Sequence, residues 1–311
     1  MISVSAGWQP SSHIMERVDS LIRDYRRHVR AVLDPLVRAH YPLLIDARRR
    51  NEYRKMVELS TKMTLVGHAL TESAGADYDE RRRTLASLYG GCCFLADSFI
   101  DDFGQDAARD YLRRFETLLT EGWFEPRSDR ERLFYVILGR LFAARDVLDP
   151  ILRQAILRLY EAQRRDVELR LRPRSLRRLE RRRQLAVLKD CARDRSGHGI
   201  TALAAFLLPD MTLAYRSLIF GAGALIMHID DHGDCYADRR DRRITYMNQV
   251  KDPAGALRRL FLGQIDRLHR GLPPGEGHDL MIAFFWRYYI TRLAKHRQQK
   301  EEGGAAWAVY E

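Results

Sequence analysis

The sequence LIFGAGALIMHIDDHGDCYAD, residues 218–238, carries an apolar helical run that ends in a series of aspartates. Residues 217–229 contain no acidic, lysine or arginine side chain, and their small residues permit close packing against another helix. Helical geometry places Asp230, Asp234 and Asp238 on one face, with a drift of about 80° over about 12 Å. Carboxylates in such a helix repel each other unless a cation neutralises them. The run therefore predicts a cation-binding face on a buried helix.

A second acidic run, DSFIDD, occupies residues 97–102. Asp97 and Asp101 lie about 40° apart on a helical wheel, and apolar residues cover most of the remaining surface of this helix. A helix that is apolar on most sides is buried, so this acidic face points into the protein or into a cavity. Gly104 is typical of a helix end, where the helix dipole also disfavours carboxylates. This run, too, needs a compensating cation.

The rest of the chain shows the period of an α-helix almost throughout. Apolar residues recur at intervals of three and four over about 14–36, 52–71, 82–103, 106–121, 130–145, 149–171, 175–194, 199–208, 211–238, 253–270 and 277–299. The sequence contains no Asn-Gly or Asp-Gly hairpin turn, and its prolines fall mainly between these segments. We therefore predict one all-α domain over residues 13–300, with an N-terminal tail at 1–12 and a C-terminal tail at 301–311.

Arginine dominates the charge of the chain. The net charge is +11, and 47 of the 53 basic residues are arginines. This balance indicates an anionic partner: nucleic acid, anionic lipid or a phosphorylated substrate. Arginine suits bidentate contact with phosphate in particular.

Other features of the composition favour an ordinary cytoplasmic protein. Mean hydropathy is −0.39, the longest charge-free apolar stretch is too short to span a bilayer, and the N-terminus lacks a signal-peptide pattern. The four cysteines have no CxxC spacing, so we interpret them as structural thiols: Cys92, Cys93, Cys191 and Cys235.

The two acidic runs together indicate a magnesium site. Acidic residues four apart also occur on solvated helix faces, but two such runs in two otherwise apolar helices favour a function. Clusters of carboxylate oxygens without a nearby cysteine ligand suit Mg²⁺, which binds through a few carboxylates together with a substrate phosphate. The arginine excess fits the same ligand. The residues thus predict an all-α, Mg²⁺-dependent enzyme that acts on a phosphorylated substrate.

The two runs resemble the acidic motifs of the class I isoprenoid synthases. DSFIDD looks like the DxxxDD motif of squalene and phytoene synthases, and its shifted form DDFGQD, residues 101–106, fits the DDxxxD variant of terpene cyclases. Asp230, Asp234 and Asp238 fall on the terpene-cyclase motif (N/D)DxxSxxxE, with aspartate in place of its serine and glutamate. Residues 218–250 are also similar to the tetraprenyl-β-curcumene synthase type of large terpene cyclase.

This resemblance implies a helical bundle around a central apolar cavity, with two facing acidic motifs that hold Mg²⁺, three ions per site, against a prenyl diphosphate. The implied catalytic residues are Asp97, Asp101, Asp230 and Asp234. The implied metal ligands are Asp97, Asp101, Asp102, Asp230, Asp231, Asp234 and Asp238.

The resemblance also implies diphosphate-binding residues. They are Arg183, Arg193, Arg242, Arg287 and Tyr288, of which the last two match an Arg-Tyr pair that caps the closed site. Arg181 and Arg182 could serve in place of Arg183, and the rivals of these three are Arg193 and Arg195. Both lie beside Ser196-Gly197-His198-Gly199, whose glycines we expect to break a helix next to the substrate.

The predicted function is ionisation of a prenyl diphosphate followed by cyclisation or rearrangement of the carbocation. One alternative is a head-to-head prenyltransferase of the squalene or phytoene synthase type. A second is a basic helical protein without catalysis, and residues 164–183 fit a solvated basic helix or peripheral contact with an anionic membrane. No recognisable motif supports a nucleic-acid partner. The resemblance is consistent with a homodimer.

Overall fold

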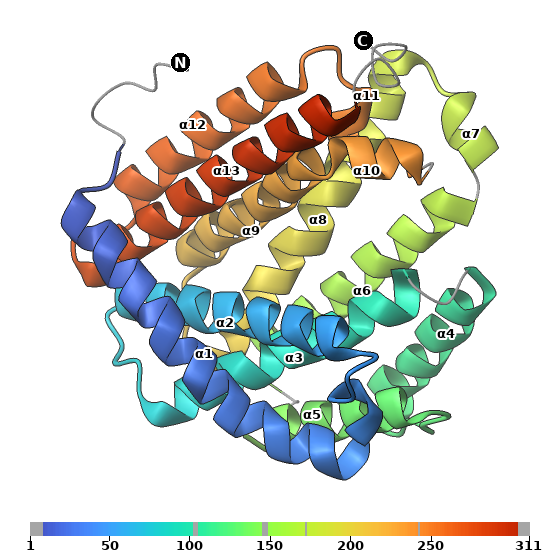
Figure 1. Ribbon diagram of the computed structural model, residues 1–311, viewed down its shortest axis with the longest axis vertical. Coiled ribbons are helices and arrows are strands. Elements are labelled where there is room, and N and C mark those ends of the chain that lie inside the picture. The colour runs from blue at the N-terminus through green and yellow to red at the C-terminus, as the bar shows by residue number, and fades with distance from the viewer. Residues whose placement is uncertain (1–8, 102–104, 145–148, 172, 242, 304–311) are drawn as a thin grey trace.

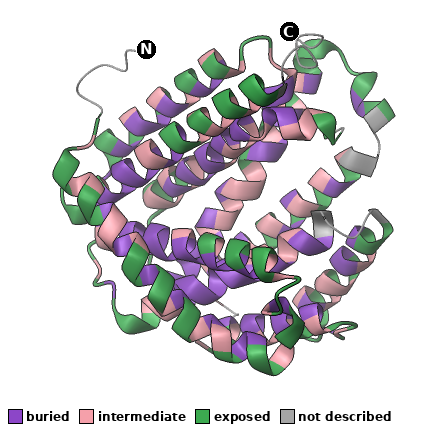
Figure 2. Ribbon diagram, viewed as in Figure 1, coloured by how far each residue is buried: buried purple, intermediate pink, exposed green. Residues whose placement is uncertain are grey.

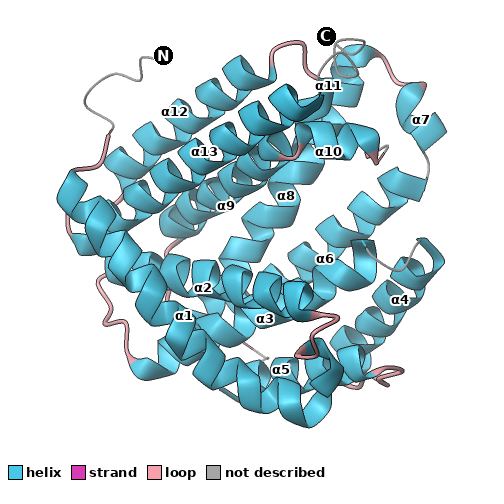
Figure 3. Cartoon of the chain, viewed as in Figure 1, coloured by secondary structure: helices cyan, strands magenta, loops and turns pink. Residues whose placement is uncertain are grey.

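The computed structural model describes residues 9–101, 105–144, 149–171, 173–241 and 243–303, apart from the side chains at 100, 101, 105, 170, 171, 173 and 303. Within these ranges the chain forms helices and contains no strand (Figure 3). The prediction of an all-α protein is confirmed. None of the helices in the described part of the chain combines the length and apolarity that a membrane-spanning segment requires.

The long helices account for most of the described chain. They are α1 (Ser12–His40), α2 (Arg50–Ser73), α3 (Glu80–Asp101), α4 (Gln105–Glu121), α5 (Asp129–Ala144), α6 (Pro150–Leu171), α8 (Arg181–Leu207), α9 (Leu213–Gly233), α12 (Pro253–Gly271) and α13 (Glu276–Gly303). The short ones are the 3-10 turn η2 (Pro42–Leu44), α7 (Pro173–Arg177), α10 (Cys235–Arg240) and α11 (Tyr246–Gln249).

The helices form two packed groups (Figure 1). Helices α9, α12 and α13 lie side by side in one group, and α1, α2, α3 and α5 form the other. Helices α13 and α8 join the groups: α13 packs against α2 as well as α9, and α8 packs against α9 and α6 and also contacts α2 and α3. Buried residues lie mainly on the helix faces turned toward other helices, and exposed residues lie mainly on the outside (Figure 2). Helices α3 and α9, which carry the two acidic runs, therefore both contact α8.

Two glycines allow the helices that carry the acidic runs to pack closely. A Cβ atom on Gly223 of α9 would overlap the carbonyl oxygen of Ser196 in α8. A Cβ atom on Gly90 of α3 would likewise overlap the backbone of Ser60 in α2. Each glycine lies about two turns before the aspartate that begins its acidic run. Close backbone contact at the glycine therefore sets the position of the carboxylates above it.

Helix α8 differs from the prediction. Residues 175–194 and 199–208 were expected to be separate helices, broken at the glycines, but α8 continues from Arg181 to Leu207, so the predicted break is wrong. The glycines serve packing instead. The ring of Phe220 lies 2.6 Å from the Cβ position of Gly197, and the hydroxyl of Tyr89 donates a hydrogen bond of 2.6 Å to the Gly199 carbonyl.

The predicted helix 211–238 is divided in the structure. Helix α9 ends at Gly233, and α10 begins at Cys235, with Asp234 at the junction. The amide of Asp234 still donates to the carbonyl of Asp230 at 2.9 Å, and that of Asp238 to Asp234 at 2.8 Å. Because the four-residue hydrogen-bond pattern continues across the junction, the three aspartates keep nearly the same face.

A buried histidine ties α1 to α2 and predicts a pH dependence of stability. His68 accepts or donates a hydrogen bond of 2.7 Å with the Tyr25 hydroxyl and stacks on Tyr78. Burial lowers the pKa of His68 to about 4, although Glu276 opposes the shift. Since the unfolded chain takes up this proton near pH 6.5, folding stability contributed by His68 is present above pH 6.5 and is lost as the pH falls toward 4.

We therefore expect the free energy of unfolding to fall by about 2–3 kcal/mol more between pH 6.5 and 4 in the wild type than in His68→Gln. Glutamine does not titrate but can still bond to Tyr25. Urea unfolding followed by circular dichroism at several pH values measures the difference. Parallel pH curves for the two proteins would contradict this role of His68.

Candidate active site

A cavity of about 630 Å³ lies among α3, α6, α8, α9 and α10. We call it the acidic cavity, because seven aspartates and three arginines line it among the described residues. They are Asp97, Asp166, Asp230, Asp231, Asp234, Asp238 and Asp241, with Arg177, Arg195 and Arg243. The protein as a whole carries a net charge of +11. The local excess of carboxylates is therefore opposite in sign to the molecule around it.

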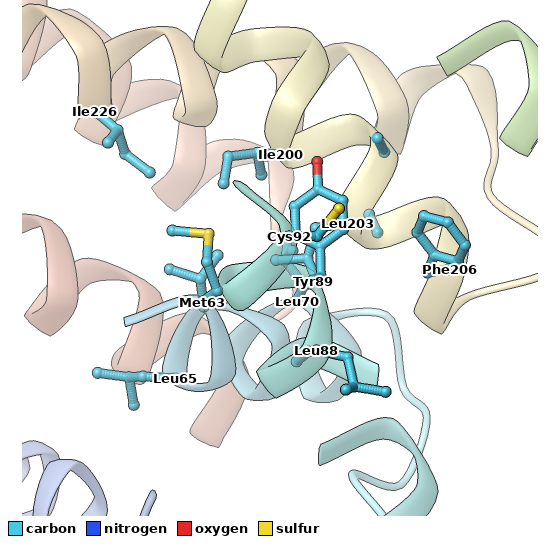
Figure 4. Packing of buried hydrophobic residues seen from close by; sticks show 14 of the residues in the cluster. Met63, Leu65, Leu70, Leu88, Tyr89, Cys92, Ile200, Leu203, Phe206 and Ile226 are labelled. Atoms are coloured by element: carbon cyan, nitrogen blue, oxygen red, sulfur yellow. The ribbon is translucent and has the colours of Figure 1, made fainter. Parts of the chain in front are cut away.

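A second cavity, of about 210 Å³, lies between α2, α3, α5, α6, α8 and α9. We call it the apolar cavity, since aliphatic and aromatic side chains form most of its wall. Met63, Tyr89, Ile200 and Ile226 approach it from four different helices (Figure 4). The Tyr89 hydroxyl is already bonded to a backbone carbonyl. The wall is therefore largely without polar groups that could react with a bound ligand.

The two cavities meet at a common boundary. Asp97, Arg195, Met227 and Asp230 line both of them. Asp97 comes from the first acidic run and Asp230 from the second, and both are half-buried. The structure thus brings the first aspartates of the two runs, 133 residues apart in sequence, to the mouth of one apolar space.

Helix α13 supplies cations to the second acidic run. Arg292 forms an ion pair with Asp230, and Lys295 forms one with Asp234. Tyr288, which lies one turn before Arg292, accepts a hydrogen bond of 3.2 Å from it. Tyr288, Arg292 and Lys295 are spaced by four and three residues, so they share one helix face. The sequence spacing already shows that these three side chains share a face. Only the packing of α13 against α9 shows that this face lies against Asp230.

Basic side chains of the protein itself therefore neutralise part of the negative charge of the second acidic run. Asp231 also lines the acidic cavity. Burial raises the pKa of Asp231 well above its usual range, and the nearby carboxylate of Asp238 raises it further, while Arg195 opposes the shift. A cation bound beside Asp231 would favour its charged form and so oppose this shift.

The donor set suits Mg²⁺. Among the described residues, no group of three or more His, Cys, Asp or Glu side chains is arranged to hold a metal ion by itself. Magnesium commonly binds proteins through one or two carboxylates and takes its other ligands from water and substrate phosphates. Carboxylate oxygens spread around a cavity of this volume fit that mode of binding.

Arg195 is held by an aspartate that the sequence interpretation missed. Its guanidinium lies 2.9 Å from Asp166 of α6, which also accepts a hydrogen bond of 3.5 Å from the Cys191 thiol. The pair joins α6 to α8 and keeps a cation at the boundary of the two cavities. Asp166 lies within an arginine-rich segment, where its sequence context resembles that of a surface ion pair.

The other predicted arginines lie elsewhere. Arg183 and Arg193 are exposed on α8 and line neither cavity. Arg193 instead pairs with Asp190 and Asp194. The side chains of residues two apart are separated by a rotation of about 200° around the helix axis. Because Arg195 lies on the inner face of α8, Arg193 lies on the outer face. Of the two rivals, the structure places Arg195 at the boundary of the cavities.

Arg287 forms an ion pair with Asp19 of α1, whereas its neighbour Tyr288 is buried beside Asp230. The predicted Arg-Tyr pair is therefore divided, and Arg292 is the arginine that accompanies Tyr288 at the acidic run. Arg242, Asp102 and the side chain of Asp101 lie outside the described residues. Asp106, at the start of α4, is fully exposed.

No family model and no curated protein matches the sequence of this chain. The structure is similar to the crystal structure of a linalool/nerolidol synthase from Streptomyces clavuligerus, which was solved in complex with 2-fluorogeranyl diphosphate. The sequences are 13% identical, the TM-score is 0.49, and the similarity covers 95% of this chain and 99% of that one.

Proposed function

We propose that this chain is a Mg²⁺-dependent terpene synthase that ionises a prenyl diphosphate and cyclises or rearranges the resulting carbocation. The observation that carries the proposal is the junction of the acidic and apolar cavities at Asp97 and Asp230. A ligand with a charged head and an apolar tail fits this pair of cavities, with the head at the carboxylates and the tail inside.

The charge of the acidic cavity supports a substrate that binds together with a divalent cation. Seven aspartates against three arginines, counted among the described residues, repel a bare diphosphate and attract a cation. Asp97, Asp230, Asp231, Asp234 and Asp238 are the side chains that would hold Mg²⁺ there. When bound, Mg²⁺ supplies Lewis-acid stabilisation of the diphosphate leaving group.

The chain's own basic residues have separate roles under this proposal. Arg195 binds diphosphate oxygens from the boundary of the two cavities, where Asp166 orients its guanidinium. Arg292 and Lys295 position the carboxylates of Asp230 and Asp234 through their ion pairs. These contacts place the leaving group before the reaction begins, which lowers the cost of ordering it in the transition state.

The apolar cavity suits a reactive cation. Aromatic rings of Tyr89, Phe115 and Phe134 line it, and ring faces attract positive charge. Exclusion of water matters because water would quench the carbocation. The volume of about 210 Å³ is below the ~300 Å³ at which typical ligand pockets begin. This small volume favours one short prenyl chain over the two chains that a coupling enzyme must hold.

Incubation of the purified protein with Mg²⁺ and geranyl, farnesyl or geranylgeranyl diphosphate tests the proposal. Diphosphate release is measured with a coupled assay, and extracted products are identified by mass spectrometry. We expect diphosphate to be released and EDTA to abolish this release. We also expect a cyclised or rearranged hydrocarbon or alcohol with the same number of carbon atoms as the prenyl chain. A product of doubled carbon number would favour the coupling enzyme, and no release from any substrate would reject both.

A substitution in the apolar cavity is expected to shift the preferred chain length. Ala96 lines this cavity next to Asp97, so Ala96→Leu removes space where the tail enters. We expect kcat/KM for farnesyl relative to geranyl diphosphate to fall by about 10–100-fold, because added bulk in a fitted pocket discriminates by ~1–3 kcal/mol. Ala107→Leu, at an exposed position of α4, is the matched control. An unchanged ratio in Ala96→Leu would argue against a tail in this cavity.

A further inference from the structure

A third cavity, of about 1090 Å³, is lined by residues of α7, α8, α10, α11, α12 and α13. We call it the basic cavity, because six arginine or lysine side chains and one aspartate line it among the described residues. They are Arg177, Arg181, Arg239, Arg243, Lys251 and Lys300, with Asp252. Its charge is opposite to that of the acidic cavity, although both are lined by Arg177, Arg243 and Ile244.

Two of these arginines are anchored by neutral oxygen atoms. Arg181 donates to the side-chain oxygen of Gln249 at 3.1 Å and also to the backbone carbonyl of the same residue. Arg239 donates to the backbone carbonyl of Asn248 at 3.2 Å. Bonds of this kind fix the direction of a guanidinium without cancelling its charge, whereas Arg193 on the outer face of α8 is neutralised by two carboxylates. The charges of Arg181 and Arg239 therefore remain available to a ligand.

The floor of the basic cavity is held in place by Asn248. Its side-chain nitrogen donates to the carbonyl of Arg243 at 2.8 Å, and its side-chain oxygen accepts from the Thr245 amide at 3.0 Å. The Thr245 hydroxyl accepts from the Asn248 amide in return and completes a capping box. Because Asn248 is buried, these bonds are protected from water. The segment that separates the acidic and basic cavities is thus built before any ligand arrives.

We propose that the basic cavity binds an anion that carries two or more phosphate groups, at a site distinct from the acidic cavity. Cationic side chains reach it from α7, α8, α10, α13 and the segments around α11. That number exceeds what one phosphate group requires, and arginine forks match phosphate oxygens in pairs. Binding here needs no divalent cation, because the cavity is itself positive. The inference therefore does not depend on the proposed function.

Isothermal titration of the full-length protein with sodium diphosphate in the presence of EDTA tests this site. We expect saturable binding at one site per chain, and binding of orthophosphate at least 10-fold weaker. Arg181→Gln combined with Arg239→Gln is expected to weaken diphosphate binding by at least 10-fold. Arg174→Gln combined with Arg178→Gln removes the same charge from exposed positions nearby that do not line the cavity, and should retain the affinity.

The outcomes separate this site from its alternatives. Asp97→Asn combined with Asp230→Asn should leave metal-free binding unchanged, whether or not the proposed catalysis is correct. Three results would overturn the inference: no saturable binding, an equal loss in the two double arginine variants, or a loss in the aspartate variant. Binding to phosphatidylglycerol vesicles without diphosphate binding, if abolished by Arg181→Gln with Arg239→Gln, would assign the cavity to a membrane surface instead.

Discussion

Asp97→Asn combined with Asp230→Asn is expected to lower kcat for diphosphate release by at least about 10³-fold while the protein remains folded. Both carboxylates lie at the boundary of the acidic and apolar cavities, where the charge of the leaving group develops under the proposed function. Asparagine preserves shape but loses the negative charge that would hold Mg²⁺. Each single variant should lose about 10²-fold, because either run alone retains part of the site.

Steady-state kinetics at saturating substrate and several Mg²⁺ concentrations measure the effect, and circular dichroism confirms the helical content. Asp24→Asn is the matched control, since Asp24 is an exposed residue of α1 that lines neither cavity. Asp106→Asn separates the motif variants: full activity supports DxxxDD, and a loss of about 10²-fold supports DDxxxD. Wild-type activity in the double variant would place the chemistry elsewhere in the molecule.

Gly223→Ala is expected to destabilise the fold by about 2–3 kcal/mol, because the new methyl group overlaps a backbone carbonyl of α8. Backbone atoms cannot rotate away as a flexible side chain can, so α9 must shift relative to α8. The shift also changes the position of Asp230 in α9 relative to Arg195 in α8 at the boundary of the cavities. We therefore expect diphosphate release to fall further than the loss of folded protein explains.

Gly263→Ala is expected to change the free energy of unfolding in the opposite direction to Gly223→Ala. Gly263 lies inside α12, and a Cβ atom there would meet no atom within 4 Å. Alanine should stabilise the helix by about 0.5–1 kcal/mol, because glycine loses more backbone freedom on folding. Urea unfolding at constant pH measures both variants. Equal effects of the two substitutions would contradict close contact between α8 and α9 at Gly223.

The candidate site shows where sequence reasoning reaches its limit. Asp97 and Asp230 could be recognised from the sequence, because a buried carboxylate in an apolar helix is costly in free energy unless a cation accompanies it. Arg195 and Arg193 have nearly the same sequence context, and only the rotation of α8 distinguishes the cation at the cavities from the one in solvent. Arg292 was missed for a related reason, because its partner Asp230 belongs to another helix.

The sequence by itself determined that the chain is helical, where most helices begin and end, and which aspartates are unusual. These properties depend on local backbone preferences and on the period of apolar residues, which neighbouring positions encode. The tertiary structure decided that α8 runs unbroken past Gly197, that the two acidic runs meet at one cavity, and which arginines accompany them. Those outcomes depend on close packing between helices far apart in sequence, where a single glycine contact sets the rotation of a helix and therefore the direction of its side chains.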